Sequence, residues 1–184
     1  YCIIPYAIGK VRSKEPSLVI EEINNLVKDD HKEVVLTGIH TGHYGADLKD
    51  YSFARLLKEI VKINGLERLR ISSIEITELN DEVLEVLKNN KIIVSHLHVP
   101  LQSGSNEILK LMNRKYDKEY FINKIEEIRG IRPEISITTD IIVGFPGETE
   151  ELFNETLDTV NKIKFSKIHV FPFSLRKGTK AEEL

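Results

Sequence analysis

The sequence is poor in several residues whose abundance would identify a protein class directly. Its 184 residues include one cysteine, one methionine and no tryptophan. A single cysteine excludes a disulfide within the chain and favours a reducing compartment. No apolar run approaches the roughly 20 residues of a membrane span, and no signal-peptide pattern opens the chain. These absences predict a cytoplasmic protein that has no membrane partner.

The sequence also lacks an excess of charge of one sign. Lys and Arg total 26 and Asp and Glu total 29, for a formal net charge of -3. The strongly basic balance that indicates nucleic-acid binding is therefore absent. Any binding of RNA would depend on a local basic patch or on residues outside the chain. The length is typical of one domain, and hydrophobic residues at 41% can supply a sizeable core.

Short apolar runs alternate with segments that have helical periodicity. The run "EVVLTG" ends at Gly38 and is typical of a buried parallel strand. The segment "SFARLLKEIVKI" repeats apolar residues at helical spacing. Ser17 is expected to cap the first helix. Expected strands lie at 33–38, 68–75, 95–104, 136–145 and 166–174, and expected helices at 17–30, 52–63, 81–90, 105–112, 117–130 and 149–163.

Repeated β–α units predict a parallel sheet with helical crossovers, either a barrel or an open doubly wound sheet. No G-x-G-x-x-G follows a strand, which weakens a dinucleotide-binding interpretation. The series begins with a helix, although a crossover helix normally has a strand on each side. We therefore expect that a first strand is missing and that five parallel strands are visible.

Ligands of such folds bind where strands end, and several polar or glycine-rich stretches follow the expected strands. The stretch "GFPGET" combines two glycines with the start of a helix, so it could bind a ligand or form only a tight turn. His96 and His98 form H-x-H on one face of a strand, and Asp140 and His169 could complete a zinc site. A packed or hydrogen-bonded histidine pair is the more common arrangement, and exposure is the default for the loop histidines His40 and His43.

Taken together, these stretches resemble the radical S-adenosylmethionine superfamily, and within it the tRNA methylthiotransferases. The resemblance covers nearly the whole chain and rests on motifs in family order: "YCIIPYAIGKVRS", "VVLTGIHTGHYG", "RISSIEITEL", "HLHVPLQSGSNEILKLMNRKY", "TTDIIVGFPGETEELF" and "HVFPFSLRKGT". "LTGIH" and "HVFPFSLRKGT" favour the branch that acts on threonylcarbamoyladenosine. The branch that acts on isopentenyladenosine usually has Gly-Gln-Asn at 38–40.

The resemblance implies a role for the single cysteine. The family's cluster motif is C-x3-C-x-aromatic-C, and Tyr1-Cys2 looks like its last two positions. Cys2 would be the third ligand of a [4Fe–4S] cluster, whose open iron binds S-adenosylmethionine, and Tyr1 would pack near the adenine. The other two cysteines would lie upstream, so the chain by itself is expected to hold the cluster poorly and to be inactive.

The resemblance assigns further cofactor contacts to the ends of strands. Thr37 and Gly38 resemble the segment that binds the amino group of S-adenosylmethionine, and Gln102 and Ser103 the ribose-facing segment. The adenine segment, Gly-x-Ile-x-Gly-x-x-Glu in the superfamily, has Asp140 at its first position, Gly147 in place of its glutamate and Glu148 one place late. The remaining expected contacts are Ile142, Gly144, Glu75, Arg114 and Arg176. No catalytic residue beyond those that position the cofactor is expected.

The implied reaction is radical abstraction of hydrogen from C2 of an adenosine beside the tRNA anticodon, followed by insertion of sulfur and methylation. It would need tRNA, an electron donor and a second cluster on an N-terminal domain. The implied fold is a partial (β/α)6 TIM-like barrel. Residues 1–184 would be its core domain, truncated at the N-terminus, with the N-terminal methylthiotransferase domain and the C-terminal RNA-binding domain absent.

Two alternatives remain open at this point. The first is a zinc-dependent hydrolase barrel that uses His96, His98, Asp140 and His169, with Cys2 incidental. The second is a barrel that binds a nucleotide or phosphate at "GFPGET" without chemistry. Metal analysis distinguishes the first alternative from a radical enzyme, and turnover of S-adenosylmethionine distinguishes the second.

Overall fold

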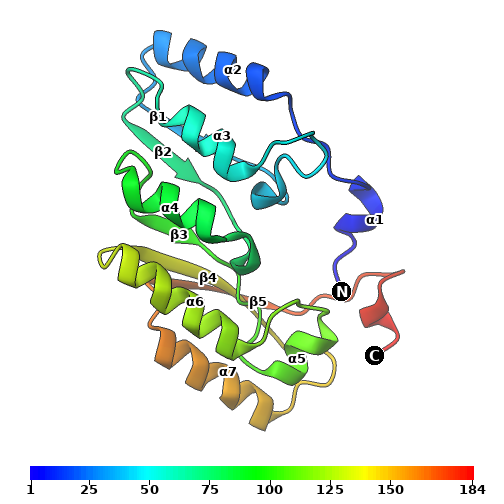
Figure 1. Ribbon diagram of the computed structural model, residues 1–184. Coiled ribbons are helices and arrows are strands. Elements are labelled where there is room, and N and C mark those ends of the chain that lie inside the picture. The colour runs from blue at the N-terminus through cyan, green and yellow to red at the C-terminus, as the bar shows by residue number, and fades with distance from the viewer.

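The computed structural model describes residues 1–184 as five parallel strands and seven α-helices (Figure 1). The strands are β1 (Glu33–Leu36), β2 (Arg68–Ile71), β3 (His96–His98), β4 (Ser136–Val143) and β5 (Lys167–Pro172). The helices are α1 (Ile4–Ile8), α2 (Pro16–Lys28), α3 (Phe53–Ile60), α4 (Asp81–Asn89), α5 (Asn106–Leu111), α6 (Lys118–Ile131) and α7 (Glu150–Ile163). The expected alternation of strands and helices is confirmed.

The strands follow one another in chain order. β1 pairs with β2, and β4 lies between β3 and β5, with every pairing parallel. Isolated parallel bridges from Leu69 to Ile93 and from Ser73 to His98 connect the two groups. The sheet is open, with β1 at one edge and β5 at the other, as the partial barrel predicts. None of the helices combines the length and the apolar character that a membrane span needs.

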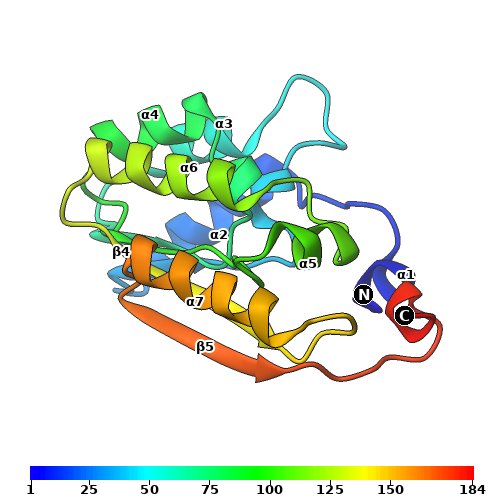
Figure 2. The same ribbon diagram turned by 90° about the horizontal axis from the view of Figure 1, so that it is seen from below.

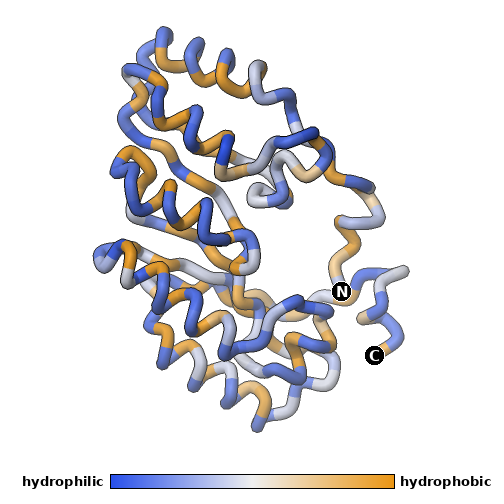
Figure 3. The backbone as a smooth tube through the Cα atoms, viewed as in Figure 1, coloured by the Kyte–Doolittle hydropathy of each residue, from blue (hydrophilic) through white to orange (hydrophobic).

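The helices α2, α3, α4, α6 and α7 lie on the outer face of the curved sheet (Figures 1 and 2). Hydrophobic and hydrophilic residues alternate along them, as expected for helices that bury one side (Figure 3). A core of 31 buried residues fills the space between sheet and helices, and includes the fully buried Leu57, Leu69 and Leu97. The opposite, concave face of the sheet is thereby left for polar side chains.

The starts of α4, α6 and α7 follow the sequence signals closely, whereas the expected stop of α6 at Gly130 is wrong because the helix continues to Ile131. The side chains of Asn80, Asp117 and Thr149 accept hydrogen bonds from backbone N–H groups in the first turns of α4, α6 and α7. The expected cap at Ser17 is wrong: Glu15 is the N-cap residue of α2, and Pro16 occupies its first turn. Proline suits that position because its missing N–H has no partner there in any helix.

Candidate functional site

Strand alternation determines which side chains reach the concave face. In β4, Ile137, Thr139 and Ile141 are buried, whereas Thr138 and Asp140 are half-buried on the other face. The same rule sends Leu97 of β3 into the core. Polar residues of β3 and β4, together with Ile142, therefore line the inside of the open barrel.

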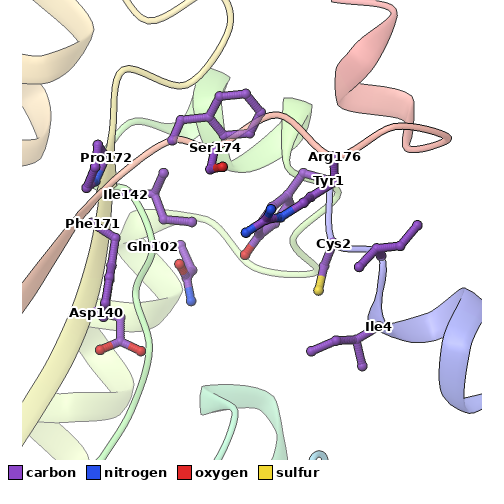
Figure 4. A pocket seen from close by; sticks show the side chains of 12 residues that line it. Tyr1, Cys2, Ile4, Gln102, Asp140, Ile142, Phe171, Pro172, Ser174 and Arg176 are labelled. Atoms are coloured by element: carbon purple, nitrogen blue, oxygen red, sulfur yellow. The ribbon is translucent and has the colours of Figure 1, made fainter.

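A pocket of about 390 Å³ lies at the carboxyl ends of β4 and β5. Its walls come from the N-terminal segment, the loop after β3, β4, and the end of β5 with the segment that follows. The lining residues are Tyr1, Cys2, Ile3, Ile4, Gln102, Asp140, Ile142, Phe171, Pro172, Phe173, Ser174 and Arg176. In Figure 4, Gln102 lies between Asp140 on one side and Tyr1 and Cys2 on the other. Mostly apolar walls with a few polar groups are typical of small-molecule sites.

Gln102 has the most unusual backbone of the lining residues. Its φ is +69°, in the left-handed region that side-chain-bearing residues seldom adopt. Its N–H donates to the Asp140 carbonyl at 2.8 Å, and its own carbonyl accepts from the Ile142 N–H at 2.9 Å. These two bonds hold Gln102 against β4. Conformations of this kind often occur at ligand sites, where the surrounding structure maintains them.

Tyr1 is held in place by a charged network. One Arg114 Nη donates to the Glu75 carboxylate and the other to the Tyr1 hydroxyl, each at 2.7 Å. Burial raises the pKa of the Tyr1 hydroxyl, so Tyr1 is neutral at neutral pH. Burial would lower the pKa of the guanidinium, but the surrounding tyrosine oxygens and Glu75 outweigh burial and raise it. Arg114 thus joins Tyr1 to Glu75. Tyr1 lines the pocket, whereas Glu75 and Arg114, which the sequence predicted to contribute to it, are not among the lining residues.

Aromatic packing supports the same wall of the pocket. The Tyr1 ring meets Phe145 edge-on with centroids 5.8 Å apart, and Phe145 meets Phe173 at 5.0 Å. Phe145 belongs to a small buried cluster with Ile108, Met112 and Ala181, separate from the main core. This cluster brings the first residue, the turn after β4 and the C-terminal segment together beneath the pocket, next to each other in Figure 2.

The wall opposite Tyr1 carries a carboxylate between two imidazoles. Asp140 Oδ2 lies 3.2 Å from His98 Nε2, and Asp140 Oδ1 lies 3.2 Å from His169 Nδ1. Thr138 Oγ1 lies 2.9 Å from His98 Nδ1 and 3.1 Å from His96 Nε2. Three of the four residues of the hydrolase alternative therefore converge, while His96 pairs with Thr138 instead.

The turn "GFPGET" has a conformation that requires glycine. Gly144 has φ +72° and Gly147 has φ +88°, both in the left-handed region. The Gly144 N–H donates to the Glu148 carboxylate at 2.5 Å, so Glu148 closes the turn before α7. This contact gives Glu148, displaced by one place from the superfamily pattern, a role within the turn.

Other expected cofactor residues lie away from the pocket lining. Thr37 and Gly38 are in the loop after β1, next to the short 3-10 turn Thr41–His43. Ser103 is fully buried; its hydroxyl lies 3.2 Å from Thr156 Oγ1 and accepts from the Ser105 N–H. Their roles toward S-adenosylmethionine stay predictions.

Sequence reasoning missed much of the apolar lining. The stretch "VFPFS" contributes Phe171, Pro172 and Phe173 to the pocket lining. Its position at the carboxyl end of the last strand was the signal that could have identified them. Ile3 and Ile4 follow Cys2 directly and gave no signal beyond that proximity. Glu78, a buried carboxylate after β2, lies within the motif "RISSIEITEL" but was assigned no role.

The pocket fits S-adenosylmethionine, and the chain fits one ligand of an iron–sulfur cluster. The volume is within the roughly 300–1,000 Å³ of small-molecule sites. Cys2 is exposed and lines the pocket, so its thiolate is accessible to iron. The chain contains one cysteine and can thus supply one thiolate.

Comparisons of sequence identify related proteins over the whole chain. The profile of the radical SAM superfamily matches residues 1–160. The chain is 51% identical over 185 aligned residues to the threonylcarbamoyladenosine tRNA methylthiotransferase MtaB of Bacillus subtilis, covering 100% of this chain and 41% of that protein. It is 46% identical, with coverage of 100% and 42%, to the tRNA-2-methylthio-N(6)-dimethylallyladenosine synthase of Carboxydothermus hydrogenoformans. The chain thus spans about two fifths of the length of these relatives.

Comparisons of structure support the fold. Coproporphyrinogen III oxidase HemN of Escherichia coli, a radical SAM enzyme, matches with a TM-score of 0.66 at 19% identity, covering 95% of this chain and 42% of that one. The cobalamin-dependent radical enzyme OxsB matches with the same TM-score at 14% identity, with coverage of 95% and 26%. The partial-barrel prediction is confirmed. Neither set of relatives supports the zinc hydrolase alternative.

Proposed function

The chain belongs to the radical SAM superfamily, and on that basis we propose that it forms the radical SAM domain of a tRNA methylthiotransferase. Identity of 51% over the full chain to MtaB is the observation that carries the proposal. When bound at a [4Fe–4S] cluster, S-adenosylmethionine would provide the radical that abstracts a hydrogen atom from the substrate, and a further S-adenosylmethionine would provide the methyl group. The residues of this chain bind and orient the cofactor and exclude water.

The residues around the pocket are proposed to have separate roles in binding the cluster and the cofactor. Cys2 is one iron ligand, and the remaining ligands come from residues outside this chain. Tyr1, fixed by Arg114 and Glu75, forms the adenine-facing wall. Gln102 and Asp140 supply polar contacts, and Arg176 adds a positive charge.

The apolar residues of the same pocket have a separate role. Ile142 and Phe173 keep the site dry. A dry site protects a reactive intermediate from water and strengthens electrostatic contacts to the cofactor.

The proposed substrate is adenosine that carries a threonylcarbamoyl group, next to the anticodon of a tRNA, with the methylthio group added at C2. The 51% identity to the threonylcarbamoyladenosine enzyme of Bacillus subtilis supports this choice of substrate. The motif Gly38-Ile39-His40 supports the same branch.

The complete protein is proposed to contain more than this domain. An N-terminal methylthiotransferase domain would carry the second cluster, and a C-terminal domain would bind tRNA. This arrangement agrees with a chain that spans about two fifths of its relatives and with its formal net charge of -3. An electron donor would reduce the cluster.

Nucleoside mass spectrometry tests the proposal. The complete protein is expressed in a bacterial strain that lacks its own methylthiotransferases, alongside a Cys2→Ala variant and a His31→Ala control at an exposed position between α2 and β1. We expect methylthiolated threonylcarbamoyladenosine in tRNA with the wild type and the control, and none with Cys2→Ala. Methylthiolation of dimethylallyladenosine instead would refute the substrate, and no methylthiolation of either nucleoside would refute the function.

A further inference from the structure

A second cluster of metal-binding side chains lies outside the pocket, between the loops that follow β1 and β2. His40 precedes the 3-10 turn Thr41–His43, His43 is the last residue of that turn, and Glu78 ends the 3-10 turn Ile76–Glu78. Glu78 Oε1 lies 3.1 Å from His40 Nδ1 and 3.7 Å from His43 Nε2. One ligand atom from each of the three residues falls within 4.8 Å of the others.

Backbone contacts fix the orientation of the Glu78 carboxylate. Its side chain is 5% exposed. Oε2 accepts from the N–H of Gly42 and from the N–H of Glu75, both at 3.2 Å. A Cβ at Gly42 would overlap Glu78, so the loop approaches the carboxylate as closely as glycine permits. These contacts occupy Oε2 and leave Oε1 directed at the two imidazoles. Outer-shell hydrogen bonds orient metal-binding carboxylates in the same way.

Hydrogen bonding accounts for only one of the two imidazoles. His40 Nδ1 is at hydrogen-bond distance from Oε1, but His43 Nε2 at 3.7 Å is beyond it. Nevertheless the rings are stacked, with centroids 4.8 Å apart and an interplanar angle of 17°. Tetrahedral zinc with bonds of about 2.0–2.1 Å holds its ligand atoms about 3.3 Å apart. The two observed distances lie on either side of that value.

The cluster of His98, Asp140 and His169 differs in this respect. There each imidazole faces its own carboxylate oxygen at 3.2 Å, so two ordinary hydrogen bonds account for the geometry. At Glu78, by contrast, both imidazoles face one oxygen. The side chains of His40 and His43 are also 50% and 54% exposed, which gives an ion and its water ligand access from solvent.

We propose that His40, His43 and Glu78 form a site for a divalent transition metal of the zinc type, distinct from the S-adenosylmethionine pocket. Two imidazoles and one carboxylate are a ligand set that zinc accepts, with a fourth position open to water. The ion would join the loop after β1 to the loop after β2. Since Glu75 lies on the second loop and holds Arg114, the metal would stabilise the support of Tyr1.

Cobalt absorption and zinc calorimetry test the site in the 184-residue chain. A Cys2→Ser background removes the thiolate, which would otherwise bind either ion. Co²⁺ should give the visible absorption of tetrahedral coordination, and Zn²⁺ should bind with a stoichiometry of about one. His43→Ala, at an exposed position, should weaken Zn²⁺ binding by at least the roughly 10–100-fold that outer-shell changes cost. His40→Ala should do the same.

Two controls keep the test specific. His31→Ala, at an exposed position between α2 and β1, and His169→Ala, in the other histidine cluster, should leave the affinity for Zn²⁺ unchanged. Absence of the tetrahedral cobalt spectrum, or equal Zn²⁺ affinity in the His43→Ala variant, would overturn the proposal. Loss of binding in His169→Ala rather than in His43→Ala would also overturn it, because it would place the metal on Asp140. None of these readouts depends on the proposed function.

Discussion

Replacing Arg114 by leucine tests whether the charged network behind Tyr1 stabilises the pocket. Arg114 is 15% exposed at its side chain and its partner Glu75 is 25% exposed. The substitution removes two hydrogen bonds of 2.7 Å and leaves the Glu75 carboxylate without a cation. Breaking a fully buried pair costs about 3–5 kcal/mol, and the partial exposure of Glu75 favours the lower end, about 3 kcal/mol.

Urea denaturation followed by circular dichroism measures that loss. For a chain of this size, about 3 kcal/mol corresponds to a fall in Tm of about 6–12 °C. Arg68→Leu is the matched control, because its Nε lies 2.7 Å from Glu33 but its side chain is 53% exposed. We expect a much smaller change there, since solvent screens exposed pairs.

A double variant separates the ion pair from general disruption. Adding Glu75→Leu to Arg114→Leu removes the uncompensated carboxylate, so the double variant should be more stable than the sum of the single changes predicts, by about 1–3 kcal/mol. An Arg114→Leu variant as stable as the Arg68→Leu control would refute the reasoning. Strict additivity in the double variant would refute it as well, because it would mean that the pair is not coupled.

Three further predictions concern packing and pH. Gly42→Ala should destabilise the fold by about 1–3 kcal/mol because the added Cβ would overlap Glu78. Gly130→Ala, inside α6 with open space around it, should instead stabilise the fold by about 0.5–1 kcal/mol. Urea denaturation measures both free energies of unfolding, and equal changes in the two variants would contradict the argument. Arg132→Met should cost about 2–4 kcal/mol because the 6% exposed Arg132 donates to two backbone carbonyls at 2.6 Å; a thermal melt no different from wild type would show those bonds to be unimportant. Burial lowers the pKa of His96 in the folded state below the value of about 6.5 that an unperturbed histidine has in the unfolded state. The unfolded state therefore binds more protons below about pH 6.5, and the free energy of unfolding should fall from pH 7 to pH 5. His96→Gln should reduce that fall, and an unchanged pH dependence would count against the shift.

The order and direction of the strands could be predicted from the sequence because each depends on local pattern. Short apolar runs such as "EVVLTG" that alternate with amphipathic helices predict a parallel sheet whose strands are connected by helices. Helix starts at Asn80 and Asp117 were readable since a side-chain cap acts within three residues. Ser17 misled because Pro16, a residue that suits a first turn, moved the start of the helix upstream.

The sequence indicated several of the residues that line the pocket, but not which residues of the site contact one another. Strand-end position and family motifs selected Tyr1, Gln102 and Asp140, all of which line the pocket. That Arg114 would bridge Tyr1 and Glu75 depends on the path of the chain over 113 residues, which no local pattern encodes. The proximity of Glu78 to His40 likewise arises from two loops that lie 38 residues apart in sequence. The left-handed conformation of Gln102 had no signal, because glycine or asparagine is the usual marker.

Iron analysis of the complete protein tests the central claim most directly. Wild-type protein and a Cys2→Ala variant are reconstituted anaerobically with iron and sulfide, and both elements are measured together with S-adenosylmethionine binding. If Cys2 is a ligand of a [4Fe–4S] cluster at the pocket, the variant should hold about four fewer irons per chain and should lose binding of S-adenosylmethionine. Equal iron content and equal binding in the two proteins would contradict the assignment of this pocket to a radical SAM centre.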